Sequence, residues 1–110
     1  MIKQKKELID QYKNRRQTGG VFAIRNTVLD KWYIDATADL KAAENRFAAF
    51  GSSTYGKIAR DHLAQKGAGF VFEVLEELTM GANQTNEEFK DDLALLKSIW
   101  MEKMADHALY

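Results

Sequence analysis

The stretch from Gly20 to Asp35 constrains the fold of this chain more than any other segment. It contains two short runs of β-branched and aromatic residues, Val21–Ile24 and Trp32–Ile34, joined by a polar connection, which is typical of a β-hairpin. The connection from Asn26 to Lys31 lacks the Asn-Gly dipeptide of a two-residue loop. The pattern therefore predicts the hairpin but leaves its register open.

Alternation along each strand predicts which side chains share a face of the sheet. In the first strand Phe22 and Ile24 share one face, and in the second strand Tyr33 and Asp35 share one face.

Helical spacing of apolar residues follows the hairpin, and Gly51 with two serines ends this first helix. Its apolar positions are Leu40, Ala43, Phe47 and Phe50. A second helix over residues 54–66 is expected to bury Tyr55, Ile58, Ala59 and Leu63. The run Phe70–Leu75 is apolar on both faces except at Glu73, which predicts a central strand.

The last helix is predicted by Thr85 and Glu88, which fit a capping box at its start. Its core stripe consists of Phe89, Leu93, Leu96, Trp100 and Met104. His107 lies beyond this helix in a segment expected to fray. His62 is interpreted as a core or boundary histidine.

With a charged helix over residues 3–16, the predicted order is α-β-β-α-α-β-α. It implies an α/β or α+β fold with a small three-stranded, mainly antiparallel sheet flanked by helices. The 110 residues correspond to one domain, in which residues 1–18 are an N-terminal helical extension.

The composition, 45% hydrophobic and 29% charged, is that of an ordinary soluble globular chain. No apolar run approaches the roughly 20 residues of a membrane span, and neither a signal segment nor a cysteine is present. These features favour a cytoplasmic protein with no membrane partner.

Charge is balanced overall, with 16 basic and 16 acidic side chains, so no basic footprint for nucleic acid stands out. Residues 1–16 carry six basic and two acidic side chains, whereas residues 73–110 carry three basic and nine acidic ones. This asymmetry fits either two solvated helical faces or a basic docking arm.

The hairpin strands carry the triplets Gly20-Val21-Phe22 and Tyr33-Ile34-Asp35. In this frame the chain resembles the GIY-YIG nuclease family, whose strands carry Gly-Ile-Tyr and Tyr-Ile-Gly. The resemblance extends from about Gly19 to Met104 and implies the family's small layered fold. The opening Lys6–Arg15 is similar to a bacterial branch labelled as resembling LuxR-type regulators, although no helix-turn-helix domain accompanies it.

Active members of that family use two tyrosines, an arginine and a glutamate that holds one divalent metal. The resemblance places Phe22 and Tyr33 at the tyrosine positions, so one hydroxyl is lost. Asp35 replaces a glycine and adds negative charge where a phosphate would approach.

The family arginine falls on Ala42 or Ala43, and the metal-binding glutamate falls on Lys97, whose ammonium would repel a metal ion. Arg46 and Glu102 are the nearest substitutes, and Glu102 lies on a different helical face.

These replacements predict a catalytically degenerate GIY-YIG-like binding or regulatory module, with no catalytic residue, metal site or cofactor. Its expected surface is the concave face over the hairpin, with Arg25, Arg46, Lys57 and Arg60 as contacts for nucleic acid bound at low affinity. One alternative is a weak Mg- or Mn-dependent endonuclease that uses Tyr33 and Arg46. Another is a protein-protein interaction module or homodimer.

Overall fold

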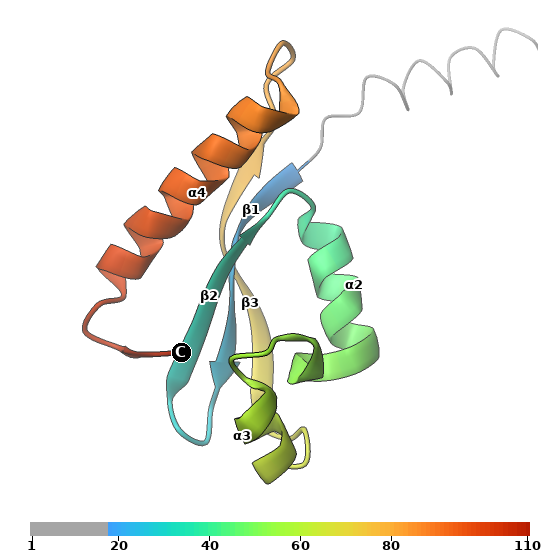
Figure 1. Cartoon of the computed structure of the whole chain (residues 1–110), viewed down its shortest axis with the longest axis vertical. Helices are drawn as coiled ribbons and strands as arrows, with labels where there is room; N and C mark the ends of the chain where they lie inside the picture. Colours follow the sequence, from blue (N-terminus) through green and yellow to red (C-terminus); the bar gives the residue numbers. More distant parts are fainter. Residues whose placement is uncertain (1–17) are drawn as a thin grey trace, which may run out of the picture.

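The computed structural model describes residues 18–110, which form an α+β fold with one open, mainly antiparallel sheet (Figure 1). Its four strands are β1 (Thr18–Asn26), β2 (Lys31–Thr37), β3 (Phe70–Thr79) and β4 (Ala108–Leu109). The helices are α2 (Leu40–Phe50), α3 (Ala59–Ala64) and α4 (Asn86–Lys103), with a 3₁₀ turn at Gly51–Thr54. The helix expected over residues 3–16 lies outside the described residues.

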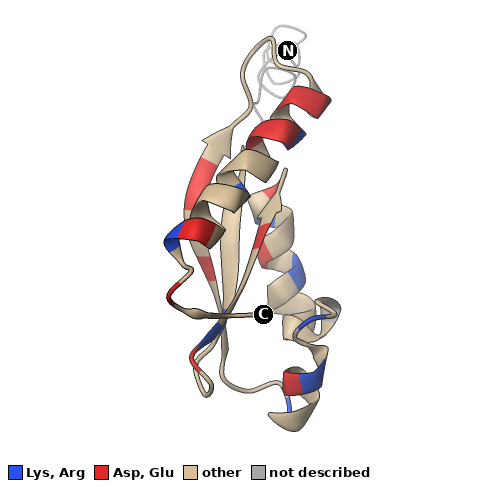
Figure 2. Ribbon diagram, turned by 60° about the vertical axis from the view of Figure 1, so that its left-hand side comes forward, with Lys and Arg blue, Asp and Glu red and all other residues tan. Residues whose placement is uncertain are grey.

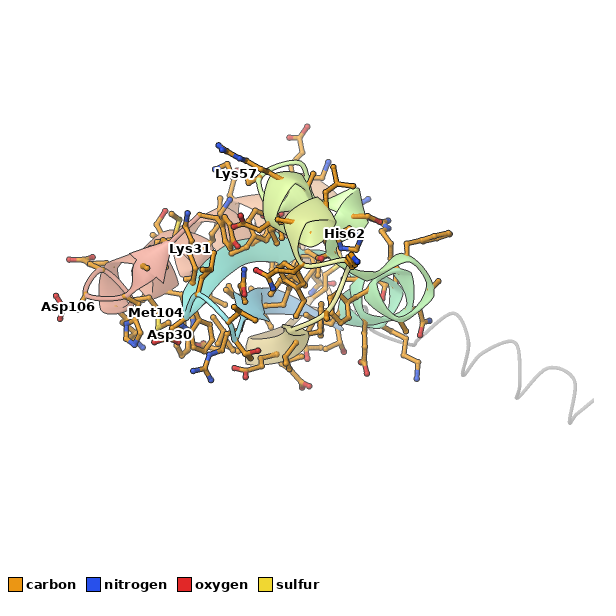
Figure 3. The ribbon with its side chains drawn as sticks, turned by 90° about the horizontal axis from the view of Figure 1, so that it is seen from below. Asp30, Lys31, Lys57, His62, Met104 and Asp106 are labelled. Atoms are coloured by element: carbon orange, nitrogen blue, oxygen red, sulfur yellow. The ribbon has the colours of Figure 1, made fainter. Side chains whose placement is uncertain are left out.

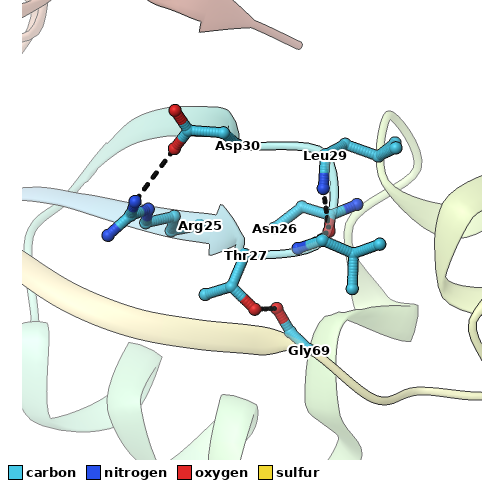
Figure 4. Close-up of polar contacts among 7 residues, drawn as sticks. Arg25, Asn26, Thr27, Leu29, Asp30 and Gly69 are labelled. Carbon is cyan, nitrogen blue, oxygen red and sulfur yellow. Dashed lines mark hydrogen bonds and ion pairs between the residues drawn. The ribbon is translucent and has the colours of Figure 1, made fainter.

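The predicted hairpin is confirmed, and its turn is organised by Asn26. The Asn26 Oδ1 atom accepts hydrogen bonds from the backbone N–H groups of Val28 at 3.1 Å and Leu29 at 3.3 Å, which replaces the missing Asn-Gly signal. Asp30 adopts a positive φ of 50° that aspartate tolerates, and its carboxylate pairs with Arg25 at 2.9 Å (Figure 4).

The strand order β3-β1-β2-β4 places β1 inside the sheet and β3 at its border. The prediction that Phe70–Leu75 is a central strand is therefore wrong. Its two valines, Val71 and Val74, remain 42% and 44% exposed, whereas β1 is buried continuously from Gly19 to Ile24. An apolar run indicates how much apolar side-chain surface a strand can bury, but it does not indicate how many neighbouring strands it pairs with.

Gly20 is required by the close approach of β3 to β1. Its φ is +155°, and a Cβ atom there would collide with the backbone carbonyl of Glu76. This contact lies next to an irregularity in the β1–β3 register between Val21 and Phe22. The glycine of the first triplet thus has a structural reason independent of any catalytic motif.

Two apolar layers enclose the sheet, and Figure 3 shows α2 and α4 on opposite sides of it. Phe22 and Ile24 pack with α2 and Ile58 on one face, while Val21 and Ala23 pack with α4 on the other. The alternation predicted for both hairpin strands is confirmed. The capping box of Thr85 and Glu88 is present, and the predicted core stripe of α4 faces the sheet or its edge.

The second helix is much shorter than predicted. Only Ala59–Ala64 is α-helical, because Tyr55 and Ile58 are buried through a preceding turn that contains Gly56. Leu63, expected in the core, is 78% exposed. No helix in residues 18–110 combines the length and apolar character needed to cross a membrane.

The C-terminal segment is ordered rather than frayed, which corrects the predicted three-stranded sheet to four strands. β4 pairs in parallel with β2 at Lys31 and Trp32, and the Tyr110 N–H donates to the Trp32 carbonyl at 2.8 Å. The His107 ring lies edge-on to the Trp32 ring at 6.1 Å. A two-residue strand has no periodicity, so no sequence pattern indicates it.

Asn26 joins this tail to the hairpin and to α3. Its fully buried amide donates to Gln65 Oε1 at 2.7 Å and to the Tyr110 hydroxyl at 2.9 Å, and that hydroxyl donates to Asp61 Oδ2 at 2.6 Å. One side chain therefore holds together three segments that are distant in sequence.

We expect Asn26→Ala to lower the free energy of unfolding by about 2–3 kcal/mol, because buried groups that lose a hydrogen-bond partner cost about 1–3 kcal/mol each. At about 4–8 °C per kcal/mol, the thermal midpoint should fall by at least about 8 °C. Asn83→Ala, in an exposed loop, is the matched control. Equal midpoints for the two variants would contradict this role of Asn26.

Candidate functional site

Three of the residues singled out in the sequence meet in one cluster, formed by Tyr33, Asp35 and Lys97 and called here the Asp35 cluster. The Tyr33 hydroxyl donates to Asp35 Oδ2 at 2.9 Å, and Lys97 Nζ lies 3.3 Å from Asp35 Oδ1. The backbone N–H of Ala36 also donates to Asp35 Oδ1, at 2.8 Å. The Asp35 carboxylate thus has three partners within its own chain.

The fold brings these side chains together from two sides of the sheet. Tyr33 and Asp35 alternate onto the face covered by α2, whereas Lys97 belongs to α4 on the other face. β4 pairs with β2 only at Lys31 and Trp32, so the β2 border beside Asp35 carries no further described strand. The long Lys97 side chain reaches Asp35 across this border.

The Tyr33 hydroxyl is poorly suited to act as a base or nucleophile. Burial raises the pKa of Tyr33 above its usual value, and the hydrogen bond to Asp35 raises it further. The ring lies 5.3 Å from that of Tyr55, which contributes to this burial. The phenol therefore keeps its proton at neutral pH and donates a hydrogen bond to Asp35.

The ion pair between Asp35 and Lys97 neutralises both charges but contributes little to the stability of the fold. The two side chains are 33% and 37% exposed. Ion pairs open to water contribute about 0–1 kcal/mol. Its main consequence is that neither charge is left available to an incoming ligand without breaking the pair.

Phe22, at the other tyrosine position of the resemblance, is part of the core. It is 2% exposed, and its ring stacks on Phe72 at 5.1 Å and lies 6.1 Å from Tyr55. A hydroxyl at this depth would have no access to solvent. Phe22 therefore provides no solvent-accessible hydroxyl oxygen at this position.

The residues at the expected arginine position and their nearest substitutes make no hydrogen bond or ion pair with the Asp35 cluster. Ala43 is buried in the α2 layer, and the backbone N–H of the exposed Ala42 is capped by Asp39 at 3.1 Å. Arg46 and Glu102 are exposed, on α2 and α4 respectively.

The residues present do not fit a divalent metal. Asp35 is the only carboxylate in the cluster and it is paired with an ammonium group, whereas Mg²⁺ and Mn²⁺ prefer several oxygen ligands. Within the described part of the chain, no group of three or more acidic, histidine or cysteine side chains is arranged to hold an ion.

The four basic candidates do not share one surface. Arg25 lies on the α4 face, paired with Asp30, and its guanidinium lies 5.0 Å from the centre of the Trp32 ring. Arg46, Lys57 and Arg60 are exposed on or beside α2 and α3, which cover the opposite face, and Figure 3 shows Lys57 pointing away from the sheet.

A serine–histidine pair also occurs, although the sequence gives no signal for it. His62 Nδ1 and Ser52 Oγ share a hydrogen bond of 2.7 Å. Ser52 is buried in the 3₁₀ turn and His62 is half-buried on α3, so the serine has no path to a substrate. The pair fastens the turn to α3, in agreement with the prediction of a boundary histidine.

Comparison of the chain with family models, with curated proteins and with solved structures found no match.

The raised pKa of Tyr33 predicts how stability responds to alkaline pH. A tyrosine whose pKa is higher in the folded protein contributes fully below its unfolded value of about 10 and loses that contribution as the pH rises further. We expect the thermal midpoint to fall more steeply above about pH 10 for the native chain than for Tyr33→Phe. Lysine titration is common to both proteins, so parallel profiles would contradict the prediction.

Proposed function

We propose that this chain is a GIY-YIG-like domain that has lost phosphodiester hydrolysis and acts as a binding module. The observation that carries the proposal is the ion pair between Asp35 and Lys97, made at the position where a nuclease of that family would need a metal and a phosphate. The hairpin, the two following helices, the third strand beside β1 and the last helix agree with the order that the resemblance implies.

Hydrolysis of a phosphodiester requires a polarised attacking oxygen and fixed positive charge on the developing oxyanions. Here the Tyr33 phenol is held protonated, Ala43 supplies no cation, and Lys97 is neutralised by Asp35. Removing one such stabiliser typically lowers the rate by about 10²–10³. Several losses together leave no useful catalysis.

Low affinity for nucleic acid follows from the same charges. The chain has no net charge, and Arg25 is already paired with Asp30, so Arg46, Lys57 and Arg60 are the remaining candidate phosphate contacts. Three contacts correspond to a slope of about −2.7 for log affinity against log salt. Polypeptide binding is therefore the stronger form of the proposal.

We expect purified protein with Mg²⁺ or Mn²⁺ to leave supercoiled plasmid intact, and Tyr33→Phe to behave identically. Gel electrophoresis over a time course measures the nicked fraction. Nicking by the native chain that disappears in Tyr33→Phe would overturn the proposal, because that residue carries the only hydroxyl at the two tyrosine positions. Nicking by both proteins that persists after a further purification step would also overturn the proposal, because hydrolysis would then occur without Tyr33.

A salt titration against labelled duplex DNA tests the nucleic-acid form separately. We expect dissociation constants no tighter than the 10⁻⁴–10⁻⁶ M range of non-specific binding, and further weakening in the triple variant R46A/K57A/R60A. Tight binding that survives physiological salt would make nucleic acid the primary ligand.

A further inference from the structure

The outer border of β3 is the longest unpaired strand edge in the described part of the chain. β3 runs from Phe70 to Thr79 and pairs with β1 alone, and in Figure 3 no described helix lies beyond it. The opposite border of the sheet is different, because β4 pairs with part of β2 and Lys97 crosses beside Asp35.

The hydrogen-bond phase of the ladder identifies the backbone groups that face outward. The Thr27 N–H donates to the Gly69 carbonyl at 2.8 Å, so Val71 and Glu73 direct their backbone groups toward β1. By alternation, the N–H and C=O groups of Phe70, Phe72 and Val74 point away from the sheet. These three residues offer the repeating donor and acceptor pattern that an added strand needs.

The length of this edge suits a short peptide. The register with β1 is regular from Asn26–Phe70 to Phe22–Val74 and then breaks, which leaves five β3 residues in phase. At about 3.4 Å per residue this is a straight edge of about 17 Å. Val71 and Val74 are half-exposed on the two faces and can pack against the side chains of an added strand.

The charges along β3 select the partner. Glu73, Glu76 and Glu77 lie on this strand, and Figure 2 shows acidic positions along β3 and over the first turns of α4. Glu76 accepts a hydrogen bond from Trp100 Nε1 at 2.9 Å. In residues 18–110 the ion pairs involve Asp30 and Asp35, so neither Glu73 nor Glu77 has a basic partner.

A second copy of the chain is a poor occupant of this edge. Pairing of β3 with β3 would bring two sets of the same carboxylates alongside one another, and like charges across strands are destabilising. Charged side chains on an exposed edge are also a common protection against self-association. A strand bearing lysine or arginine would instead form favourable cross-strand pairs of roughly 0.2–1 kcal/mol each.

We infer that the outer edge of β3, from Phe70 to Val74, binds an extended, positively charged polypeptide segment as an added antiparallel or parallel strand. This inference rests on the proposed binding role and names the chemistry of the partner. Backbone hydrogen bonds to the outward groups supply affinity. The carboxylate of Glu73 within this edge supplies selectivity, assisted by that of Glu77 three residues beyond it.

The test uses the full chain and a synthetic hexapeptide, acetyl-Lys-Val-Lys-Val-Lys-Val-amide, measured by calorimetry and by amide chemical shifts. We expect saturable binding with shifts concentrated at Phe70, Phe72 and Val74. A peptide N-methylated at alternate residues keeps the charge but loses hydrogen-bond donors, and the peptide with glutamate in place of lysine reverses the charge. Both should bind at least tenfold more weakly.

The variant E73K/E77K should also lose at least tenfold in affinity. Its matched control is E44K/E102K, which makes the same change in net charge at exposed positions on α2 and α4 and should bind as the native chain does. Far-ultraviolet circular dichroism and thermal midpoints verify that both variants fold. Equal losses in the two variants would reduce the effect to general electrostatics and overturn the inference.

Two other results would also overturn it. Unchanged binding of the N-methylated peptide would show attraction without strand addition. A concentration-dependent dimer in sedimentation equilibrium that Val74→Pro abolishes would assign the edge to a second copy, because proline removes one outward N–H and leaves the ladder to β1 intact. Failure of peptide binding does not alter the plasmid result, and plasmid nicking does not alter peptide binding, so the two proposals fail separately.

Discussion

Burial of β1 on both faces is the constraint on which the rest of this structure depends. The strand pairs with β2 on one side and β3 on the other, and helices cover its two faces. From Gly19 to Ile24, such a position needs side chains that are small or apolar. Gly20 and Ala23 allow close backbone and helix approach, while Phe22 and Ile24 fill the thicker layer under α2. The first hairpin strand therefore acts as the core of the domain.

The central role of β1 changes how its motif residues are interpreted. Phe22 lies too deep to contact a ligand, and Gly20 is fixed by the β3 backbone. Both identities are explained by packing. The motif residues that remain partly exposed lie at the border of the sheet, where Tyr33 and Asp35 of β2 contact each other and Asp35 pairs with Lys97 of α4. At that border a carboxylate and an ammonium compensate each other, so neither charge lacks a partner.

Much of the fold could be predicted from periodicity and local signals. The hairpin and its faces, the helix ended by Gly51, and the capped last helix all follow from residue spacing that local physics dictates. Strand order could not be predicted, because the hydrophobicity of Phe70–Leu75 is the same whether one neighbour pairs with it or two. β4 and the contacts of Tyr110 were missed because they depend on long-range hydrogen bonds made by single residues.

The candidate site shows the same division. Alternation placed Tyr33 and Asp35 on one face, but only the three-dimensional arrangement brings Lys97 to them from the opposite layer. The two borders of the sheet differ in how far other described residues cover them. The β2 border is covered in part by β4 and by the Lys97 side chain, whereas the β3 border keeps outward backbone groups and unpaired carboxylates. The groups of the Asp35 cluster already pair with one another. Outward backbone groups and carboxylates without a basic partner among the described residues therefore coincide at the β3 border, where the inferred peptide strand would add.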